Sequence, residues 1–464
     1  MYFNCGKWNI FLYYSTISVN LAAFVIGCCF AWTSPAIPRL NGSKEPQHNP
    51  LGEEATLTTI QESWIASLVP LGAALSSLAS GYLADRRGRK EMLIISTLIS
   101  LIGFGCMHFA NSVFYICLAR LICGLSVGMV FTIVPIYIGE IAQDSNRGFL
   151  GMFFVLFLMI GILFTYGVGS VTTLNTLNLL NFIAPVLFMI TFDWFVPESP
   201  HWLISQKRFD AAEKSLTKLR GNLPDETVAN ELEKIKKNIE EDLKNKSNLK
   251  DLLSKREFLK GIWITCGLVI FQQLSGINII LFYMHSIFED TGSSLSPDLS
   301  AIIISIVQIV ACMGSSFLID SLGRRILLMF SSIGMCLSLA AFSVYFYLKE
   351  TSDNVQDIFW LPITSIVCFM IAYAAGFGPV PFVILAELFP QQTKSLAATV
   401  TIFVCLMGTF CTTTLFPMIA LYLGVAYTFL MLAVFCFVSL IFSFICIPET
   451  KGKGLMEIQE LLKR

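Results

Sequence analysis

Residues 261 to 288 read GIWITCGLVIFQQLSGINIILFYMHSIF, an apolar run long enough to cross a bilayer. Three amides interrupt it, those of Gln272, Gln273 and Asn278. An unpaired amide in hydrocarbon costs several kcal/mol, so we expect these side chains to face a wet cavity or a polar partner. A helix turns about 100° per residue, which sets Gln272 and Asn278 about 120° apart. The two therefore line one cavity only if it is wide or if the helix breaks, and Gly276 is the candidate for a break.

The amides of this span are compatible with two interpretations. Amides donate and accept hydrogen bonds and carry no charge, which suits a neutral polyhydroxylated ligand better than an ion. Polar side chains also commonly hold membrane helices together without binding a ligand. The span alone leaves both interpretations open.

The composition is that of a multi-span membrane protein. The chain has 464 residues, of which 55% are hydrophobic and only 14% are charged, far from the balance of a soluble globular protein. A net charge of -1 gives no indication of a nucleic-acid partner. The fourteen cysteines lie mostly in apolar runs and form no CxxC pair, so we interpret them as packing residues and expect no metal or other cofactor. The N-terminus carries Lys7 and no small-residue cleavage site, so a cleaved signal peptide is not expected.

Twelve apolar stretches approach the roughly 20 residues that a helix needs to cross a bilayer. They lie approximately at 15–38, 60–84, 91–110, 113–139, 148–170, 176–196, 260–285, 298–319, 326–348, 358–384, 395–420 and 424–447. One long polar interval, 197–259, separates the sixth from the seventh. We therefore predict an all-α membrane protein with twelve transmembrane helices in two six-helix halves, 1–196 and 260–447. A linker, 197–259, joins them, and a tail, 448–464, follows.

The linker carries apolar residues at three- and four-residue steps between charges, a spacing typical of amphipathic helices. The stretches concerned are FDAAEKSLTKLRG, ETVANELEKIKKNIEEDL and LKDLLSKREFLKG. We predict short cytoplasmic helices there. A solvated linker is the alternative.

Basic residues predict the orientation, because they accumulate in cytoplasmic loops. They follow the second, fourth, eighth, tenth and twelfth spans, at 86–90, 147, 324–325, 394 and 451–453. Both termini are then cytoplasmic, and loop 39–59 lies outside. That loop contains the sequon Asn41-Gly42-Ser43, which predicts an N-glycan at Asn41.

Charged motifs recur in the two halves, as expected for an internal repeat. GYLADRRGRK at 81–90 matches SFLIDSLGRR at 316–325, PESP at 197–200 matches PETKG at 448–452, and an acid precedes a base by seven residues after both the fourth and the tenth span. We predict a cytoplasmic gate network whose charges pair when the halves close and are solvated when they part. Its members are Asp85, Arg86, Arg89, Glu140, Arg147, Glu198, Asp320, Arg324, Glu387, Lys394 and Glu449. The alternative, that the bases only set orientation, does not explain the acids.

The motifs GYLADRRGRK, PESP, QQLSGIN, DSLGRR, GFGPVPF and PETKG, in this order, resemble the sugar porter family of the major facilitator superfamily. With SPAIPRL near the first span, together with GFGP, the chain most resembles the facilitated trehalose and hexose transporters of arthropods. The resemblance covers nearly the whole chain. It implies a twelve-helix bundle with a central sugar site and alternating access.

The resemblance also implies roles for individual residues. Gln272, Gln273 and Asn278 would hydrogen-bond sugar hydroxyls, while Tyr283 would close the outer side of the site together with Phe282. A further candidate, Gln308 in the eighth span, is a sugar-binding amide or a helix-packing group.

The tenth span adds a stacking residue and a hinge. Phe382 would stack on a sugar face where many relatives carry Trp, without the ring N–H. Pro379 and Pro381 in GFGPVPF are expected in a helix interior, where they would kink the span and provide a hinge.

The sequence departs from the family pattern at several positions. Val155 stands where many hexose transporters carry Gln, and Cys405-Leu406 stands where an Asn-Trp pair is common. The site is thus less polar than expected, which leaves the identity of the sugar open. Lys394 replaces the usual Arg and loses its bidentate geometry.

The resemblance implies passive transport, because proton-coupled sugar porters carry an acid in the first span, whereas FVIGCCFAWTSP has no Asp or Glu to carry a proton in transit. Arg120 in the fourth span has no obvious acid partner in its own helix, and the sequence leaves open whether it joins the cytoplasmic network or is structural. We predict a plasma-membrane uniporter of a hexose or trehalose. The alternatives are a proton-coupled sugar symporter, a carrier of a non-sugar solute, and a non-transporting sugar sensor. An enzyme is disfavoured, because no paired carboxylates or nucleophile–base arrangement lies at membrane depth.

Overall fold

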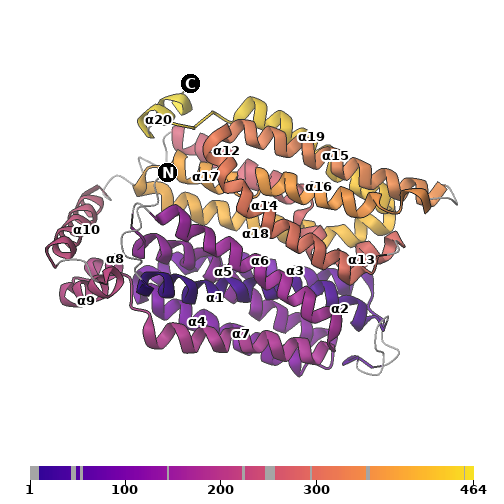
Figure 1. The fold of residues 1–464 in the computed structure, drawn as a ribbon, viewed down its shortest axis with the longest axis horizontal. Helices are drawn as coiled ribbons and strands as arrows, with labels where there is room; N and C mark the ends of the chain where they lie inside the picture. The colour runs from indigo at the N-terminus through magenta and orange to yellow at the C-terminus, as the bar shows by residue number, and fades with distance from the viewer. Residues whose placement is uncertain are drawn as a thin grey trace.

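The computed structural model describes residues 10–42, 49–52, 56–143, 146–221, 225–245, 256–292, 295–351, 356–453 and 455–463 (Figure 1). Within these ranges, the structure does not describe the side chains at positions 225, 238, 241–245, 316–321, 356, 391–392, 455–456, 459 and 463. Two predicted site features are therefore outside the described residues, namely the side chain of Asp320 and Ser43 of the sequon. Every regular element among the described residues is a helix.

Twelve segments of the described chain are long and apolar enough to cross a membrane, which confirms the predicted number of spans. The first six are formed by α1 (Ile10–Ala31) with α2 (Thr33–Leu40), α3 (Thr59–Arg87), α4 (Arg89–His108), α5 (Val113–Ile141), α6 (Arg147–Val171) and α7 (Leu174–Phe195). The second six are formed by α12 (Arg256–Leu274) with α13 (Ile277–Thr291), α14 (Pro297–Leu322), α15 (Arg324–Thr351), α16 (Leu361–Ala375) with α17 (Val380–Leu388), α18 (Gln391–Leu423) and α19 (Val425–Cys446). A short 3-10 helix, η3 (Gln356–Ile358), precedes α16.

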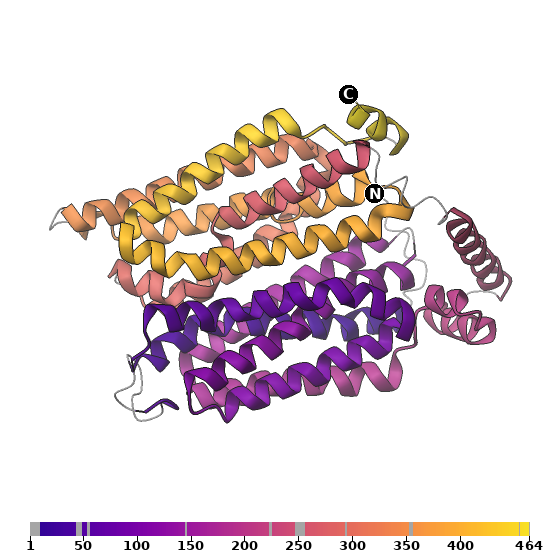
Figure 2. The same cartoon turned by 180° about the vertical axis from the view of Figure 1, so that it is seen from behind.

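The two halves lie side by side, with α1–α7 in one layer and α12–α19 in the other (Figures 1 and 2). Between them α3 packs against α18, and α6 packs against α14. The linker helices α8 (Pro200–Ser205), α9 (Phe209–Arg220) and α10 (Asp225–Asn245) lie at one end of the bundle, together with α20 (Leu455–Lys463). We call this the linker end. The opposite end, where α2 connects to α3, is the loop end.

Glycines bring α3 and α5 of the first half close together. A Cβ atom at Gly124 would lie 2.4 Å from the Val69 carbonyl oxygen, and one at Gly128 would lie 2.0 Å from the Ala73 carbonyl oxygen. Small residues allow membrane helices to pack backbone against backbone. No larger side chain fits at these two positions without moving the helices apart.

Two spans of the second half are broken near their middle. α12 ends at Leu274 and α13 begins at Ile277, with Gly276 in the left-handed region at a φ of 85°, which favours glycine. The predicted break at Gly276 is therefore confirmed. In the tenth span, α16 ends at Ala375 and α17 begins at Val380, so residues 376–379 are not helical.

We expected the prolines of the tenth span in a helix interior, and the structure shows that they do not lie there. Pro379 precedes the first residue of α17, and Pro381 lies in its first turn. Proline is tolerated there, because the N–H groups of a first helical turn have no acceptor within the helix. The span is interrupted, but the prolines begin a helix rather than kink one. A hinge at this point stays a prediction.

The linker helices pack into a small apolar cluster of their own. Ala212 and Leu216 of α9 are buried against Trp202 of α8 and against Val228 and Ile235 of α10. The described part of the linker is thus folded rather than a solvated tether. The third predicted linker helix differs. Its residues from 256 on belong to α12, which continues as a helix past the predicted boundary because no stop signal separates these charged residues from the span. Residues 249–255 of that stretch lie outside the described residues.

Arg220 fastens the linker helices to the first half. Its side chain is only 2% exposed, and its Nη1 donates to the Ile141 carbonyl oxygen at the end of α5 (2.8 Å). Its Nη2 lies 2.6 Å from Glu231 Oε1 on α10. On α8, the Trp202 ring N–H donates to the Asp85 carbonyl oxygen at 2.9 Å. The linker helices and the first half are therefore joined by buried polar contacts.

The variant Arg220→Ala should loosen α9 and α10 from the first half, because it leaves the Ile141 carbonyl and the Glu231 carboxylate without their partner. Such a loss costs on the order of 1–3 kcal/mol. We expect faster amide hydrogen exchange over residues 209–220, measured by mass spectrometry on the purified protein. Lys214→Ala, at an exposed position of the same helix, is the matched control. Equal exchange in the two variants would contradict this role of Arg220.

Candidate functional site

The amide of Gln272 joins the two broken spans. Gln272 lies in the last turn of α12 and is 3% exposed. Its Nε2 donates to the carbonyl oxygens of Phe377 (2.7 Å) and Gly378 (3.2 Å), in the break between α16 and α17. Carbonyl groups at a helix break lack their helical donors, and leaving them unpaired within a membrane costs several kcal/mol. Gln272, which lies next to the break between α12 and α13, therefore stabilises the break between α16 and α17.

Gln272 is one of five residues that we call the amide cluster. The cluster consists of Gln272, Gln273, Asn278, Cys405 and Thr409. Gln273 Nε2 lies 3.3 Å from Gln272 Oε1 and 3.1 Å from Cys405 Sγ. Gln273 Oε1 accepts a hydrogen bond from the Thr409 hydroxyl (3.0 Å) and another from Asn278 Nδ2. The break between α12 and α13 turns Asn278 toward Gln273, and the cluster thus connects α12, α13 and α18.

Most of the hydrogen-bonding capacity of the amide cluster is used within the protein. Both ends of the Gln272 and Gln273 amides have partners, so these two residues do hold helices together. The Oδ1 of Asn278 has no hydrogen bond to a described residue, and this side chain is only partly buried. On the neighbouring helix α14, Gln308 is 4% exposed and also lacks a hydrogen bond to a described residue. The groups left for a ligand are therefore Asn278 Oδ1 and the Gln308 amide.

The predicted aromatic residues lie in two different places. Tyr283 on α13 donates from its hydroxyl to the Thr413 carbonyl oxygen at 3.0 Å. Its neighbour Phe282 is fully buried, with its ring 5.5 Å from the ring of Phe30 in the first half. Phe382 lies in the first turn of α17, is 38% exposed and is not part of the amide cluster. The structure thus brings Tyr283 and Phe282 together on α13 and leaves Phe382 apart.

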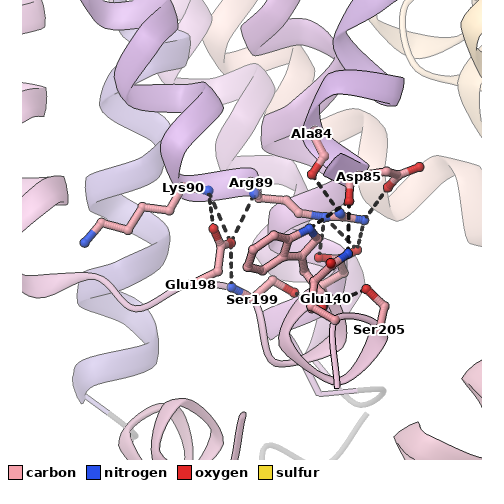
Figure 3. Close-up of polar contacts among 10 residues, drawn as sticks. Ala84, Asp85, Arg89, Lys90, Glu140, Glu198, Ser199 and Ser205 are labelled. Atoms are coloured by element: carbon pink, nitrogen blue, oxygen red, sulfur yellow. Dashed lines mark hydrogen bonds and ion pairs between the residues drawn. The ribbon is translucent and has the colours of Figure 1, made fainter. Parts of the chain in front are cut away.

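The first charged cluster lies at the linker end, where α3, α4, α5 and the start of the linker meet (Figure 3). Arg89 Nη2 lies 2.9 Å from both Asp85 Oδ1 and Glu140 Oε1, and Arg89 Nε donates to Glu140 Oε2 at 3.0 Å. Glu198 accepts hydrogen bonds from the backbone N–H groups of Arg89 and Lys90, each at 3.1 Å. These are the first N–H groups of α4 and have no acceptor in their own helix. Glu198 therefore caps α4.

The second charged cluster repeats this arrangement in the other half. Arg324 Nη2 lies 2.9 Å from Glu387 Oε1. Glu449 accepts hydrogen bonds from the backbone N–H groups of Arg324 (3.0 Å) and Arg325 (3.2 Å), and so caps α15. Gly323, with a φ of 95°, turns the chain into this helix just as the equivalent glycine does before α4. The repeated motifs therefore encode the same capped helix start in each half.

Each charged cluster lies within one half, which differs from the predicted network. We expected charges that pair across the halves or are solvated when the halves part. In the structure the acids pair with bases and N–H groups of their own half, and no ion pair or hydrogen bond between described residues joins the halves at the linker end. The physical reason is local, since a helix start and an arginine lie within reach of each acid. A latch between the halves stays a prediction.

The remaining predicted gate residues make fewer contacts. Arg86 lies 4.5 Å over the ring of Tyr82 on the same helix. Arg147 and Lys394, on opposite halves, are close enough to repel each other. Neither side chain has a hydrogen bond or ion pair with a described residue.

The two capping acids differ in acidity although their positions are equivalent. Burial raises the pKa of Glu198, and its backbone N–H donors, together with the charge of Arg89, only partly offset this effect. Burial acts in the same direction on Glu449, but backbone N–H donors outweigh it there and lower the pKa. Glu449 therefore carries its negative charge more readily than Glu198.

The sequence did not point to Thr409, and Cys405 stood out only as a departure from the family pattern. A threonine or cysteine in an apolar helix is usually a packing residue, so neither is a signal by itself. Their four-residue spacing places them on one face of α18. That spacing identifies a polar face only once α18 is known to pack against α12, which no local pattern reveals.

Asn41 of the predicted glycosylation site holds the described part of its loop against α3. Its Nδ2 donates to Glu62 Oε1, and its Oδ1 accepts from the Leu57 N–H at 2.8 Å. Asn41 thus has a structural role, whatever its modification. Glycosylation at this position stays a prediction.

Comparison with known proteins adds evidence from the whole chain. A family model described as "Sugar (and other) transporter" matches residues 16–462. The facilitated trehalose transporter Tret1 of Apis mellifera ligustica is 34% identical over 447 residues, which cover 96% of this chain and 87% of the relative. Tret1 of Polypedilum vanderplanki is 33% identical over 446 residues, which cover 96% of this chain and 86% of the relative.

Solved structures share the fold. The xylose transporter XylE from E. coli, in a partially occluded inward open conformation, has a TM-score of 0.79 at 22% identity, covering 96% of this chain and 100% of XylE. The proton:xylose symporter XylE bound to 6-bromo-6-deoxy-D-glucose has a TM-score of 0.77 at 22% identity, covering 98% of this chain and 100% of the symporter chain. At this identity the similarity establishes the fold and leaves the ligand and the coupling open.

Glu198→Ala should destabilise the start of α4, because it removes the acceptor of two backbone N–H groups. Loss of a capping acceptor costs about 0.5–2 kcal/mol. We expect a lower midpoint of thermal unfolding in detergent, with Glu198→Gln retaining part of the stability through its amide carbonyl. Glu91→Ala, an exposed acid on the same helix that lies 3.7 Å from Arg87, is the control. A midpoint for Glu198→Ala equal to that of the control would contradict the capping role.

Proposed function

The chain belongs to the sugar transporter family of the major facilitator superfamily, and on that premise we propose that it carries trehalose or a hexose across the plasma membrane by facilitated diffusion. It is a multi-pass membrane protein and a sugar transporter. The observation that carries the finer proposal is the amide cluster, a set of uncharged hydrogen-bonding groups at two breaks within the spans. Asn278 Oδ1 and the Gln308 amide offer hydrogen bonds that suit sugar hydroxyls.

The choice of trehalose as a candidate rests on two supports. The similar relatives are named facilitated trehalose transporters. In addition, Val155 and Leu406 are smaller than the Gln and Trp side chains that the family resemblance led us to expect, which favours room for a disaccharide. The contacts that bind the sugar must each be modest, because a carrier that holds its ligand tightly does not release it.

Passive transport is supported by the surroundings of Arg120. This fully buried side chain donates to the carbonyl oxygens of Ile65 (3.0 Å) and Cys29 (2.6 Å) and to the Thr33 hydroxyl (2.8 Å). Its guanidinium also lies 5.1 Å over the ring of Trp32. These partners are neutral and do not titrate during transport. Among the described residues no carboxylate pairs with Arg120, so the surroundings of Arg120 lack a group that would exchange a proton during transport.

Alternating access is supported by where the two halves touch. Tyr166 of the first half donates to the Leu281 carbonyl oxygen of the second, and the Trp64 and Phe410 rings meet at 6.3 Å. Both contacts lie nearer the loop end than the linker end of the membrane spans that make them. We infer that this structure is closed at the loop end and that transport reverses the closure.

The orientation follows from charge. Basic residues gather at the linker end, around the starts of α4 and α15. Because positive residues remain on the cytoplasmic side, we place the linker end and both termini in the cytoplasm. Closure at the loop end then corresponds to an inward-facing state.

Asn278→Ala should cut sugar uptake roughly 2- to 12-fold at unchanged surface expression, because it removes the free acceptor of the amide cluster and one net hydrogen bond is worth about that factor. Thr412→Ala is the matched control, since the Thr412 hydroxyl donates only within α18, to the Gly408 and Thr409 carbonyl oxygens. Uptake of labelled sugar by cells, normalised to surface protein, is the measurement. Equal uptake in the two variants would remove Asn278 from the site.

The energetic mode and the substrate can be tested together in proteoliposomes. We expect counterflow of labelled trehalose or glucose into vesicles that contain the same unlabelled sugar, at an initial rate that an uncoupler leaves unchanged. Uncoupler-sensitive accumulation would instead establish a proton-coupled symporter. Absence of counterflow with trehalose, glucose and fructose would show that the cargo lies outside these sugars.

A further inference from the structure

α13 is bent in a way that opens its backbone to the first half. Tyr283, in the middle of α13, has non-helical torsion angles (φ -113°, ψ 19°). In a regular α-helix the His285 N–H would donate to the Leu281 carbonyl oxygen four residues earlier. In the structure the His285 N–H donates to Ser34 Oγ at 3.1 Å, and the Leu281 carbonyl oxygen accepts from the Tyr166 hydroxyl.

Both hydroxyls belong to the first half. Ser34 lies on α2 and Tyr166 on α6, and both side chains are buried. The two hydroxyls are also neighbours of each other. The His285 imidazole points elsewhere, with its Nδ1 2.9 Å from Asp298 Oδ1 on α14. It is therefore the backbone of α13, and not this side chain, that faces Ser34.

The bend would be costly without the first half. Backbone groups within a membrane must find partners in the protein, since neither lipid nor bulk water supplies them at this depth. Ser34 provides the acceptor and Tyr166 the donor that the opened turn requires. Nearby, the Phe30 and Phe282 rings of the two halves pack 5.5 Å apart, which excludes water from the contact.

We propose that Ser34 and Tyr166 are the gating residues of the loop end, acting by exchange of hydrogen bonds with α13. When the halves meet, α13 bends and its freed N–H and C=O groups bond to the two hydroxyls. When the halves part, the His285 N–H returns to the Leu281 carbonyl oxygen and the helix straightens. Neither the His285 N–H nor the Leu281 carbonyl oxygen is left unpaired in either state, so neither state carries the cost of an unpaired backbone group. This inference rests on the proposed alternating access.

The exchange predicts that removing one hydroxyl favours the open loop end without disturbing the fold. Tyr166→Phe and Ser34→Ala each delete a single oxygen atom. Loss of one net hydrogen bond shifts a two-state ratio by roughly 2- to 12-fold. Tyr345→Phe is the matched control, because the Tyr345 hydroxyl donates to the Thr291 carbonyl oxygen, also on α13, but within the same half (2.9 Å).

The ratio of the two states can be measured as a distance. Val171 and Tyr422, which are 82% and 85% exposed, lie at the loop ends of α6 in the first half and α18 in the second. Spin labels at these two positions, in full-length protein reconstituted into nanodiscs, give the population of closed and open loop ends by electron–electron double resonance. The background lacks the exposed or undescribed cysteines, which are replaced by alanine at Cys5, Cys106, Cys368 and Cys411.

We expect the ratio of long to short distances to rise roughly 2- to 12-fold in Tyr166→Phe and in Ser34→Ala and to stay unchanged in Tyr345→Phe. Thermal unfolding of each variant checks its fold, and either variant alone suffices if the other does not fold. Ratios equal to that of the control in both variants would overturn the exchange gate. Counterflow by the unlabelled wild-type protein is measured in parallel. If the wild type exchanges no sugar, the proposed function fails, whereas the distances still decide the gate.

Discussion

The structure depends on one constraint, that every backbone N–H and C=O group within the membrane must find a partner inside the protein. Several spans of this chain are interrupted, and side chains provide hydrogen-bond partners for the backbone groups at the interruptions. Gln272 supplies the donor for the Phe377 carbonyl at one break, and Arg120 does so for the Cys29 carbonyl near the end of α1. Ser34 and Tyr166 serve the bend of α13. Polar side chains at this depth therefore bond to backbone groups or to one another, and only their remaining capacity is available to a sugar.

The two halves use the same device at the linker end. A glycine with positive φ begins a helix, a base follows it, and an acid from a distant segment caps the exposed N–H groups. Glu198 and Glu449 arrive there from the ends of the sixth and twelfth spans, which explains why PESP and PETKG stand at equivalent places in the chain. The clusters strengthen each half as a unit. Motion between rigid halves then needs few changes within either of them.

Periodicity and length predicted the spans well, because a run of about 20 apolar residues has few other solutions. The break at Gly276 was also predictable, since a glycine next to amides marks a weak point in a helix. The partners of those amides were not predictable, because Gln272 bonds to a carbonyl 105 residues away, in the break of another span whose position no local pattern reveals. The same reasoning explains the acids of the charged clusters. Their spacing predicted a repeated network, but only the fold shows that each network closes within its own half.

The docking of the linker has a mechanical consequence. Trp202 and Arg220 tie α8 and α9 to the ends of α3 and α5, so these helices turn with the first half as one rigid body. They project beyond the bundle, so a tilt of that half would displace them further than it displaces the helix ends to which they are tied. An antibody fragment bound to α9 would therefore restrict the movement of the entire first half.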